Sequence, residues 1–116
     1  MSKDEELRTK LADIAVRYLE RTSMEVEQLR ALVANVASGD KPVLRDIEVL
    51  VHRIRGSGAV FGFAEISAAA EALETVSVEQ IRSPRVDFAR TTEQLTSLTE
   101  TLAVAVAAAR TGSGER

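Results

Sequence analysis

The sequence contains no cysteine, which excludes disulfide bonds, thiolate metal sites and cysteine nucleophiles. Only 3% of its residues are aromatic and only two are proline. Alanine, leucine, glutamate and arginine dominate instead, and this composition favours helix over sheet. The longest apolar run, Leu102 to Ala109, is too short and too rich in alanine to span a bilayer. The sequence therefore predicts a helical protein without a membrane segment.

The charge pattern limits the partners of the protein. The formal net charge is -3, and no basic block supplies the concentrated positive face that nucleic-acid binding requires. The charged residues 1–6 are not followed by an apolar stretch of the signal-peptide type, so we expect a cytoplasmic protein. With 116 residues, of which 45% are hydrophobic, the chain fits one domain. We expect residues 1–116 to form that domain, with a core over about 5–110 and a flexible tail at 111–116.

Apolar residues recur at helical spacing through the first third of the chain. A first amphipathic helix is predicted from Glu5 to about Glu20. Its apolar face consists of Leu7, Leu11, Ile14, Ala15 and Tyr18. Thr22 and Glu25 have the spacing of a capping box, which would begin a second helix that runs to Val36. One long continuous helix is the alternative, and the sequence leaves both open.

A third helix is predicted after the glycine that ends the second. Gly39 tolerates the left-handed conformation that often closes a helix. Asp40 can cap the next helix, and Pro42 is acceptable in its first turn, where the backbone N–H has no helical partner. This helix should run to about Phe61 and end at Gly62.

Two further helices complete the predicted fold. A short helix carries Ile66, Ala69, Ala70, Leu73 and Val76 on one face. A loop from Ser77 to Arg82 is expected to follow, and Ser83-Pro84 would begin the last helix. That helix is marked by Phe88, Leu95, Leu98, Leu102 and Val106. Because no segment has the alternation of a strand, the predicted class is all-α, an antiparallel four-helix bundle with an additional N-terminal helix.

The single histidine of the chain, His52, is predicted on the outer face of the third helix. The opposite face of this helix consists of Val43, Ile47, Leu50, Val51, Ile54 and Phe61. The outer face also carries Arg45, Glu48, Arg55, Gly56 and Ala59. An exposed imidazole is partly neutral near pH 7 and is then nucleophilic. His52 is therefore a candidate nucleophile rather than a core residue.

Glycines near His52 support a reactive role. Gly56, Gly58 and Gly62 fall within seven residues, and each glycine inside a helix costs roughly 1 kcal/mol relative to alanine. Gly56 lies one turn beyond His52 on the same face, so its missing side chain leaves the imidazole open to a bulky partner. Arg55, also one turn along, can place a guanidinium near a phosphoryl group on the ring.

The segment from His52 to Ile66, followed by Leu73-Glu74, closely resembles the signature of histidine-containing phosphotransfer (HPt) domains. The matching pattern reads His-x-Ile-Arg-Gly-Ser-Gly-x-x-Phe-Gly-x-x-x-Ile. The resemblance implies a four-helix bundle with an accessory N-terminal helix. It also implies that His52 is the phosphoacceptor, that Arg55 is its basic neighbour and that Gly56 provides steric access. The family more often has lysine at the position of Arg55, and serine or alanine at that of Gly58, whose role stays open.

The same resemblance implies a phosphocarrier rather than an enzyme. His52 would accept a phosphoryl group from a receiver-domain aspartate or a histidine kinase and pass it to a response regulator. The implied partners are response-regulator receiver domains and a sensor or hybrid histidine kinase, and Arg45, Glu48 and Ala59 are candidate docking residues. No cofactor is expected in this chain, because the divalent metal belongs to the receiver. We expect a monomer that binds neither nucleic acid nor membrane.

Three other interpretations of the sequence compete with this one. The spacing of Gly56, Gly58 and Gly62 resembles a variant dinucleotide-binding loop, but no strand precedes it. A dimerisation domain of a sensor kinase usually has an acidic residue after the histidine and a proline soon after, whereas Arg53 follows His52 here. The main alternative is a module of the same fold that docks on receivers or kinases without carrying phosphate. Sequence alone does not separate it from a phosphocarrier.

Other candidate sites have weaker support. One histidine and no cysteine leave only carboxylates as metal ligands. The glutamates at helical spacing are predicted to be solvated surface charge, and they are Glu25, Glu27, Glu71 and Glu74. Ser57 follows a glycine, but it lacks the preceding strand that the nucleophile elbow of a hydrolase requires. No metal site and no hydrolase site is therefore predicted.

Overall fold

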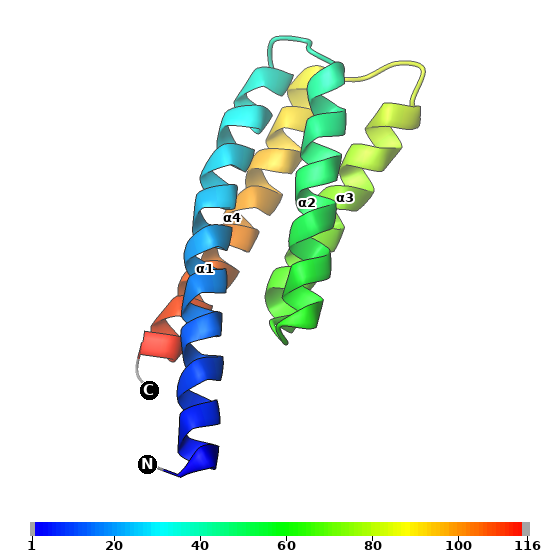
Figure 1. The fold of residues 1–116 in the computed structure, drawn as a ribbon. Helices are drawn as coiled ribbons and strands as arrows, with labels where there is room; N and C mark the ends of the chain where they lie inside the picture. The colour runs from blue at the N-terminus through cyan, green and yellow to red at the C-terminus, as the bar shows by residue number, and fades with distance from the viewer. Residues whose placement is uncertain (1, 115–116) are drawn as a thin grey trace.

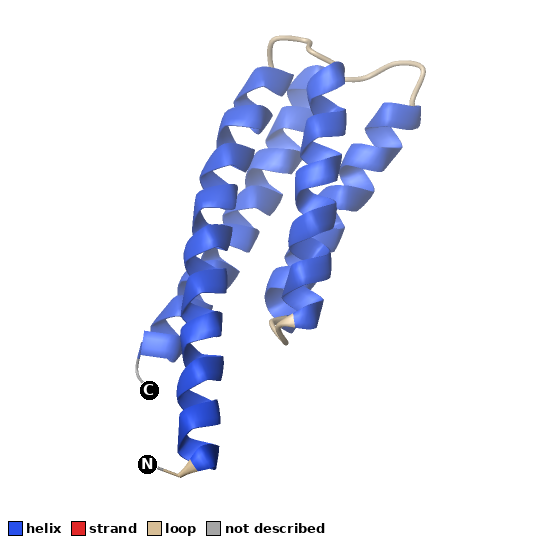
Figure 2. Cartoon of the chain, in the orientation of Figure 1, coloured by secondary structure: helices blue, strands red, loops and turns tan. Residues whose placement is uncertain are grey.

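The structure is a computed structural model that describes residues 2–114, and in this part of the chain it contains four α-helices and no strand (Figures 1 and 2). The helices are α1 (Lys3–Val36), α2 (Pro42–Val60), α3 (Ala64–Arg82) and α4 (Phe88–Gly114). The chain reverses at each connection, so that consecutive helices lie side by side (Figure 1). α1 packs against α2 and α4, and α3 packs against the same two helices. The all-helical class predicted from sequence is confirmed.

The two helices predicted before Val36 are one continuous helix, α1, so within residues 2–114 no additional N-terminal helix precedes the four. The Thr22 hydroxyl does not cap a new helix; it donates to the carbonyl of Tyr18, 2.8 Å away and one turn earlier. Ser2 caps α1 instead, and its side chain accepts from the backbone N–H of Glu5 at 3.2 Å. The capping-box interpretation of Thr22 and Glu25 was therefore wrong.

The connection from α1 to α2 depends on glycine but not on the predicted aspartate cap. Gly39 has φ +80°, a conformation that glycine adopts at little cost. Lys41 occupies the N-cap position of α2 and makes no side-chain capping hydrogen bond, whereas Asp40 accepts from Val43 only through its backbone carbonyl. Pro42 stands in the first turn, as predicted.

The connection from α3 to α4 lies later in the chain than predicted. α3 continues to Arg82, so the loop expected from Ser77 to Arg82 is helical. Ser77 is buried, and its hydroxyl donates to the carbonyl of Leu73 at 2.8 Å, which satisfies a polar side chain inside the helix. α4 begins at Phe88 rather than at Pro84, because Asp87 accepts from the backbone N–H of Arg90 at 3.0 Å and serves as its cap.

The hydrophobic core receives side chains from all four helices. The largest fully buried apolar side chains are Leu19, Leu29, Leu44, Ile47, Ile54, Ile66, Leu73, Leu95 and Leu102. One end of this core is closed by Tyr18, whose ring stacks on Phe61 and Phe63 at centroid distances of 4.6 and 5.4 Å. The first turns of α1 extend past the ends of the other helices (Figure 1), and Leu7 and Leu11 of α1 are exposed.

The C-terminal end of α4 lies inside the segment 111–116 that was predicted to be a flexible tail. Residues 111–114 are helical, whereas the tail residues Glu115 and Arg116 lie outside the described part of the chain. The helix bounds therefore place the helical part of the domain at Lys3–Gly114.

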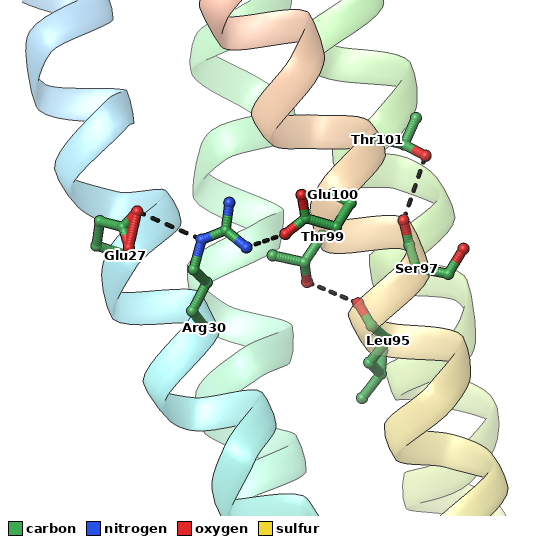
Figure 3. A network of polar contacts seen from close by, with 7 residues as sticks. All are labelled: Glu27, Arg30, Leu95, Ser97, Thr99, Glu100 and Thr101. Carbon is green, nitrogen blue, oxygen red and sulfur yellow. Dashed lines mark hydrogen bonds and ion pairs between the residues drawn. The ribbon is translucent and has the colours of Figure 1, made fainter.

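A polar contact joins α1 to α4 on the side that Figure 3 shows. Arg30 on α1 contacts Glu27 one turn away, with Nε and Oε1 3.3 Å apart, and it also pairs with Glu100 of α4. The hydrogen bond to Glu100 raises the pKa of the Arg30 guanidinium above its usual value. Because Arg30 and Glu100 are both exposed, such a pair contributes little to stability.

Gly58, whose role the sequence left open, lies where the backbones of α2 and α3 approach each other closely. A Cβ atom at this position would lie 3.1 Å from the backbone N and 3.3 Å from the Cα of Ser67. Gly58→Leu should therefore force the two backbones apart and lower the free energy of unfolding by about 1–3 kcal/mol, measured by urea titration. The matched control is Gly56→Ala on the same helix, where nothing lies within 4 Å of the added Cβ. Unchanged stability of the leucine variant would show that this contact is loose.

Candidate functional site

His52 lies on the solvent face of α2, as the sequence predicted. Its side chain is 62% exposed, whereas its neighbours Val51 and Ile54 are fully buried in the core. The helical repeat causes this difference, because position 52 is about half a turn from the positions that face α1 and α3. The imidazole is therefore open to a partner that approaches from solvent.

A carboxylate from the neighbouring helix holds one nitrogen of this ring. Nδ1 of His52 lies 2.5 Å from Oε2 of Glu74, a residue of α3. The other oxygen, Oε1, lies 2.9 Å from Nη1 of Arg55. The Glu74 side chain is only 14% exposed, so its carboxylate sits between the two helices and bridges His52 and Arg55.

The predicted role of Glu74 as solvated surface charge was therefore wrong. On α3 it stands in the regular spacing of surface glutamates, and the spacing gives no sign of a partner on another helix. The only signal in the sequence was its place at the end of the family-like pattern, 22 residues after His52. Because α2 packs on α3, His52 and Glu74 are in direct contact although they are far apart in the sequence.

The contact with Glu74 distinguishes the two ring nitrogens. An ionised carboxylate only accepts hydrogen bonds, so with Glu74 ionised the contact at 2.5 Å makes Nδ1 the donor. Nε2 of the neutral ring then has the free lone pair and is the nucleophilic atom. The arrangement therefore prepares one defined nitrogen of His52 for reaction with an electrophile.

Arg55 and Gly56 occupy the positions beside His52 that the sequence predicted. The Arg55 side chain is 41% exposed, and its guanidinium is oriented by Glu74. Its backbone carbonyl accepts from the hydroxyl of Ser67 at 2.9 Å, which ties this turn of α2 to α3. Nothing lies within 4 Å of the position that a Cβ of Gly56 would occupy. The space next to the imidazole is therefore open, and a positive charge stands beside it.

The other glutamates expected on the surface divide into two groups. Glu25 of α1 is buried, and its Oε2 lies 3.0 Å from Nε of Arg53, so it was wrongly predicted to be solvated. Glu27 and Glu71 are exposed, as predicted. The pair of Glu25 and Arg53 links α1 to α2 at the residue that follows His52 and fixes that arginine beside the site.

The candidate docking residues lie on the surface of α2, together with two exposed apolar residues that were not predicted. Arg45 and Ala59 are exposed and Glu48 is half-buried. Val49 and Val60 are 62% and 82% exposed on the same helix as His52. Their outward positions follow from the same helical repeat that identified His52, so the sequence contained the signal.

The described residues include neither a metal-binding cluster nor a membrane-spanning helix. Between residues 2 and 114, no group of three or more histidine and acidic side chains is arranged to hold a metal ion. In the same range no helix combines the length and the hydrophobicity needed to cross a bilayer. The chemistry suggested by the structure is therefore concentrated at His52, Glu74, Arg55 and Gly56.

Comparison with known proteins agrees with this arrangement. The family model described as the Hpt domain matches residues 13–109, which include α2, α3 and most of α1 and α4. Neither the curated proteins nor the solved structures contain a match. The chain therefore belongs to the Hpt domain family, whose members are phosphocarriers that interact with receiver domains and histidine kinases in two-component signalling.

Proposed function

We propose that this protein is a histidine phosphotransfer protein of a two-component phosphorelay, with His52 as the residue that carries the phosphoryl group. One observation supports this most strongly: the exposed ring is held at Nδ1 by Glu74, which leaves Nε2 open to solvent. The phosphoryl donor is a receiver aspartate or a histidine kinase, and the acceptor is a response regulator. We place this relay in the cytoplasm, and the lack of cysteine permits such a reducing compartment.

The proposed transfer step moves no proton, so it needs no base from this chain. The lone pair of Nε2 attacks the phosphorus of an aspartyl phosphate and forms the N–P bond. The P–O bond to the aspartate breaks, and its electron pair leaves with the carboxylate. The proton on Nδ1 stays in place, so the phosphorylated ring is a cation that faces Glu74. Catalytic positioning, and a divalent metal, come from the receiver.

Docking is proposed over the outer face of α2. Val49 and Val60 are exposed before and after His52 in the sequence and would offer apolar contact to a partner that docks there. Arg45, Glu48 and Ala59 lie on the same helix. Arg45 and Glu48 would make polar contacts at the rim of the interface, and the small side chain of Ala59 would let the partner come close to α2. Gly56 lies between the two valines in sequence and lets the partner's aspartate reach the ring.

Arg55→Ala should slow phosphoryl transfer from a receiver roughly tenfold, because one charge-assisted hydrogen bond to the phosphoryl group is lost. Rapid-quench measurement of transfer from a labelled receiver gives this rate. Arg55→Lys is the matched control, since it keeps the positive charge without the planar guanidinium and should retain more of the rate. An alanine variant that transfers at the wild-type rate would remove Arg55 from the mechanism.

The proposed function is tested by phosphoryl uptake from a panel of phosphorylated receiver domains. We expect the protein to acquire a label that is labile in acid and stable in alkali, as a phosphohistidine is. Binding to receivers without any uptake would instead identify a docking module of the same fold. The assay therefore separates the proposal from its main alternative.

A further inference from the structure

We propose that Glu74 retains the proton on Nδ1 after His52 is phosphorylated, and that it thereby makes the phosphohistidine a short-lived and ready donor. The inference deepens the proposed function and rests on it for the phosphorylated atom, Nε2. Glu74 acts here as a positioning residue, because it contacts the ring and not the phosphoryl group.

The geometry gives Glu74 a fixed position under the ring. One oxygen meets Nδ1 of His52 at 2.5 Å and the other meets Arg55 at 2.9 Å, so both oxygens are engaged. The neighbouring Leu73 is fully buried in the core, and α3 is held against α2 by the hydrogen bond from Ser67 to the carbonyl of Arg55. The carboxylate is largely shielded from water, which strengthens its interaction with a positively charged ring.

The proton on Nδ1 decides how easily the phosphoryl group leaves. When Nδ1 is protonated, the N–P bond breaks with its electron pair going to Nε2, and the ring departs as neutral imidazole. When Nδ1 has lost its proton, the ring must depart as an imidazolate anion, which is a much poorer leaving group. A carboxylate at Nδ1 favours the protonated cation through a charge-assisted hydrogen bond. Glu74 therefore keeps the phosphohistidine in its reactive form.

The positive charges near the ring oppose its protonation, and no acidic group other than Glu74 is in contact with the ring among the described residues. Glu74 shares Arg55, so this guanidinium is only partly available to stabilise a phosphoryl group. On α2, Glu48 lies one turn and Arg45 two turns before His52, and on α3 Glu71 lies one turn before Glu74. Among the ionisable groups that the structure describes around the ring, Glu74 is the one in contact with it.

The experiment loads the phosphoryl group chemically, with phosphoramidate, so that no receiver is needed. Wild type, Glu74→Gln and the matched control Glu71→Gln are loaded, and loss of the phosphohistidine is followed by ³¹P NMR across a range of pH. We expect the phosphohistidine of Glu74→Gln to last roughly tenfold longer near pH 7, because a neutral amide replaces a charged acceptor. The pH profile of its loss should move toward acid, and Glu71→Gln should behave as wild type.

The readouts separate this inference from the function on which it rests. Equal lifetimes in wild type and Glu74→Gln, or an equal change in Glu71→Gln, would overturn the role of the Nδ1 contact. A protein that is loaded by phosphoramidate but never by a receiver would overturn the proposed function instead. A measurement on wild type needs no variant: ¹⁵N spectra of its only histidine should show Nδ1 still protonated after phosphorylation, and an unprotonated Nδ1 at pH 7 would contradict the proposal.

Discussion

Replacing His52 with glutamine should abolish phosphoryl uptake from a phosphorylated receiver while leaving the protein folded. The chain has no second histidine that could take over the reaction, so the loss should be complete rather than partial. The glutamine amide is not nucleophilic, but it has a similar size and can still donate to Glu74. Because the His52 side chain is 62% exposed, the free energy of unfolding should change by less than about 1 kcal/mol.

Receiver binding and circular dichroism are the controls for this variant. Uptake lost with binding and helicity intact would establish His52 as the acceptor. Uptake that persists in the glutamine variant would mean that the label resides on another side chain, and the assignment of the site would be wrong.

Gly56→Glu should block transfer without unfolding the bundle, with a loss of roughly 100-fold or more because the reacting atoms can no longer meet in line. The glutamate side chain would project from the turn next to His52, into the space that is open beside the ring. It would also place a negative charge where the negatively charged phosphoryl group must arrive. The expected result is a folded protein that neither receives nor donates a phosphoryl group at a useful rate.

Gly56→Ala is the matched control for this prediction. A methyl group meets no neighbour within 4 Å, and alanine is favoured over glycine in a helix by roughly 1 kcal/mol, so stability should rise. Transfer should be largely retained, since little bulk is added. If the glutamate variant transfers as well as the alanine variant, the partner does not approach over Gly56 and the steric argument fails.

The helical repeat explains why much of the fold and the outer face of α2 were predictable. A period of 3.6 residues separates Ile54 in the core from His52 in solvent without knowledge of any other helix. The same rule did not reveal that α1 is continuous. A threonine such as Thr22 fits an N-cap, but inside a helix its hydroxyl can equally donate to the carbonyl one turn earlier, here that of Tyr18. It also missed the end of α3, where buried Ser77 looks like a loop residue until its hydrogen bond to Leu73 is seen.

The contacts between helices were the part that sequence did not supply. Glu74 and Glu25 both have the pattern of surface glutamates, yet the first meets His52 and the second is buried against Arg53. The need for glycine at position 58 is likewise explained only by the packing of α3, which places the backbone of Ser67 against Gly58. Such pairs join residues far apart in sequence, so their positions depend on how the helices pack and not on any local period.

The central claim is that Nε2 of His52 carries the phosphoryl group, and NMR of the phosphorylated protein tests it most directly. Wild-type protein labelled with ¹⁵N-histidine is incubated with a phosphorylated receiver, and its ¹⁵N and ³¹P spectra are recorded. The account predicts a single phosphoramidate resonance coupled to Nε2 of the one histidine. Phosphorus bound to Nδ1, phosphorus on an oxygen atom, or the absence of any phosphorylated species would contradict it.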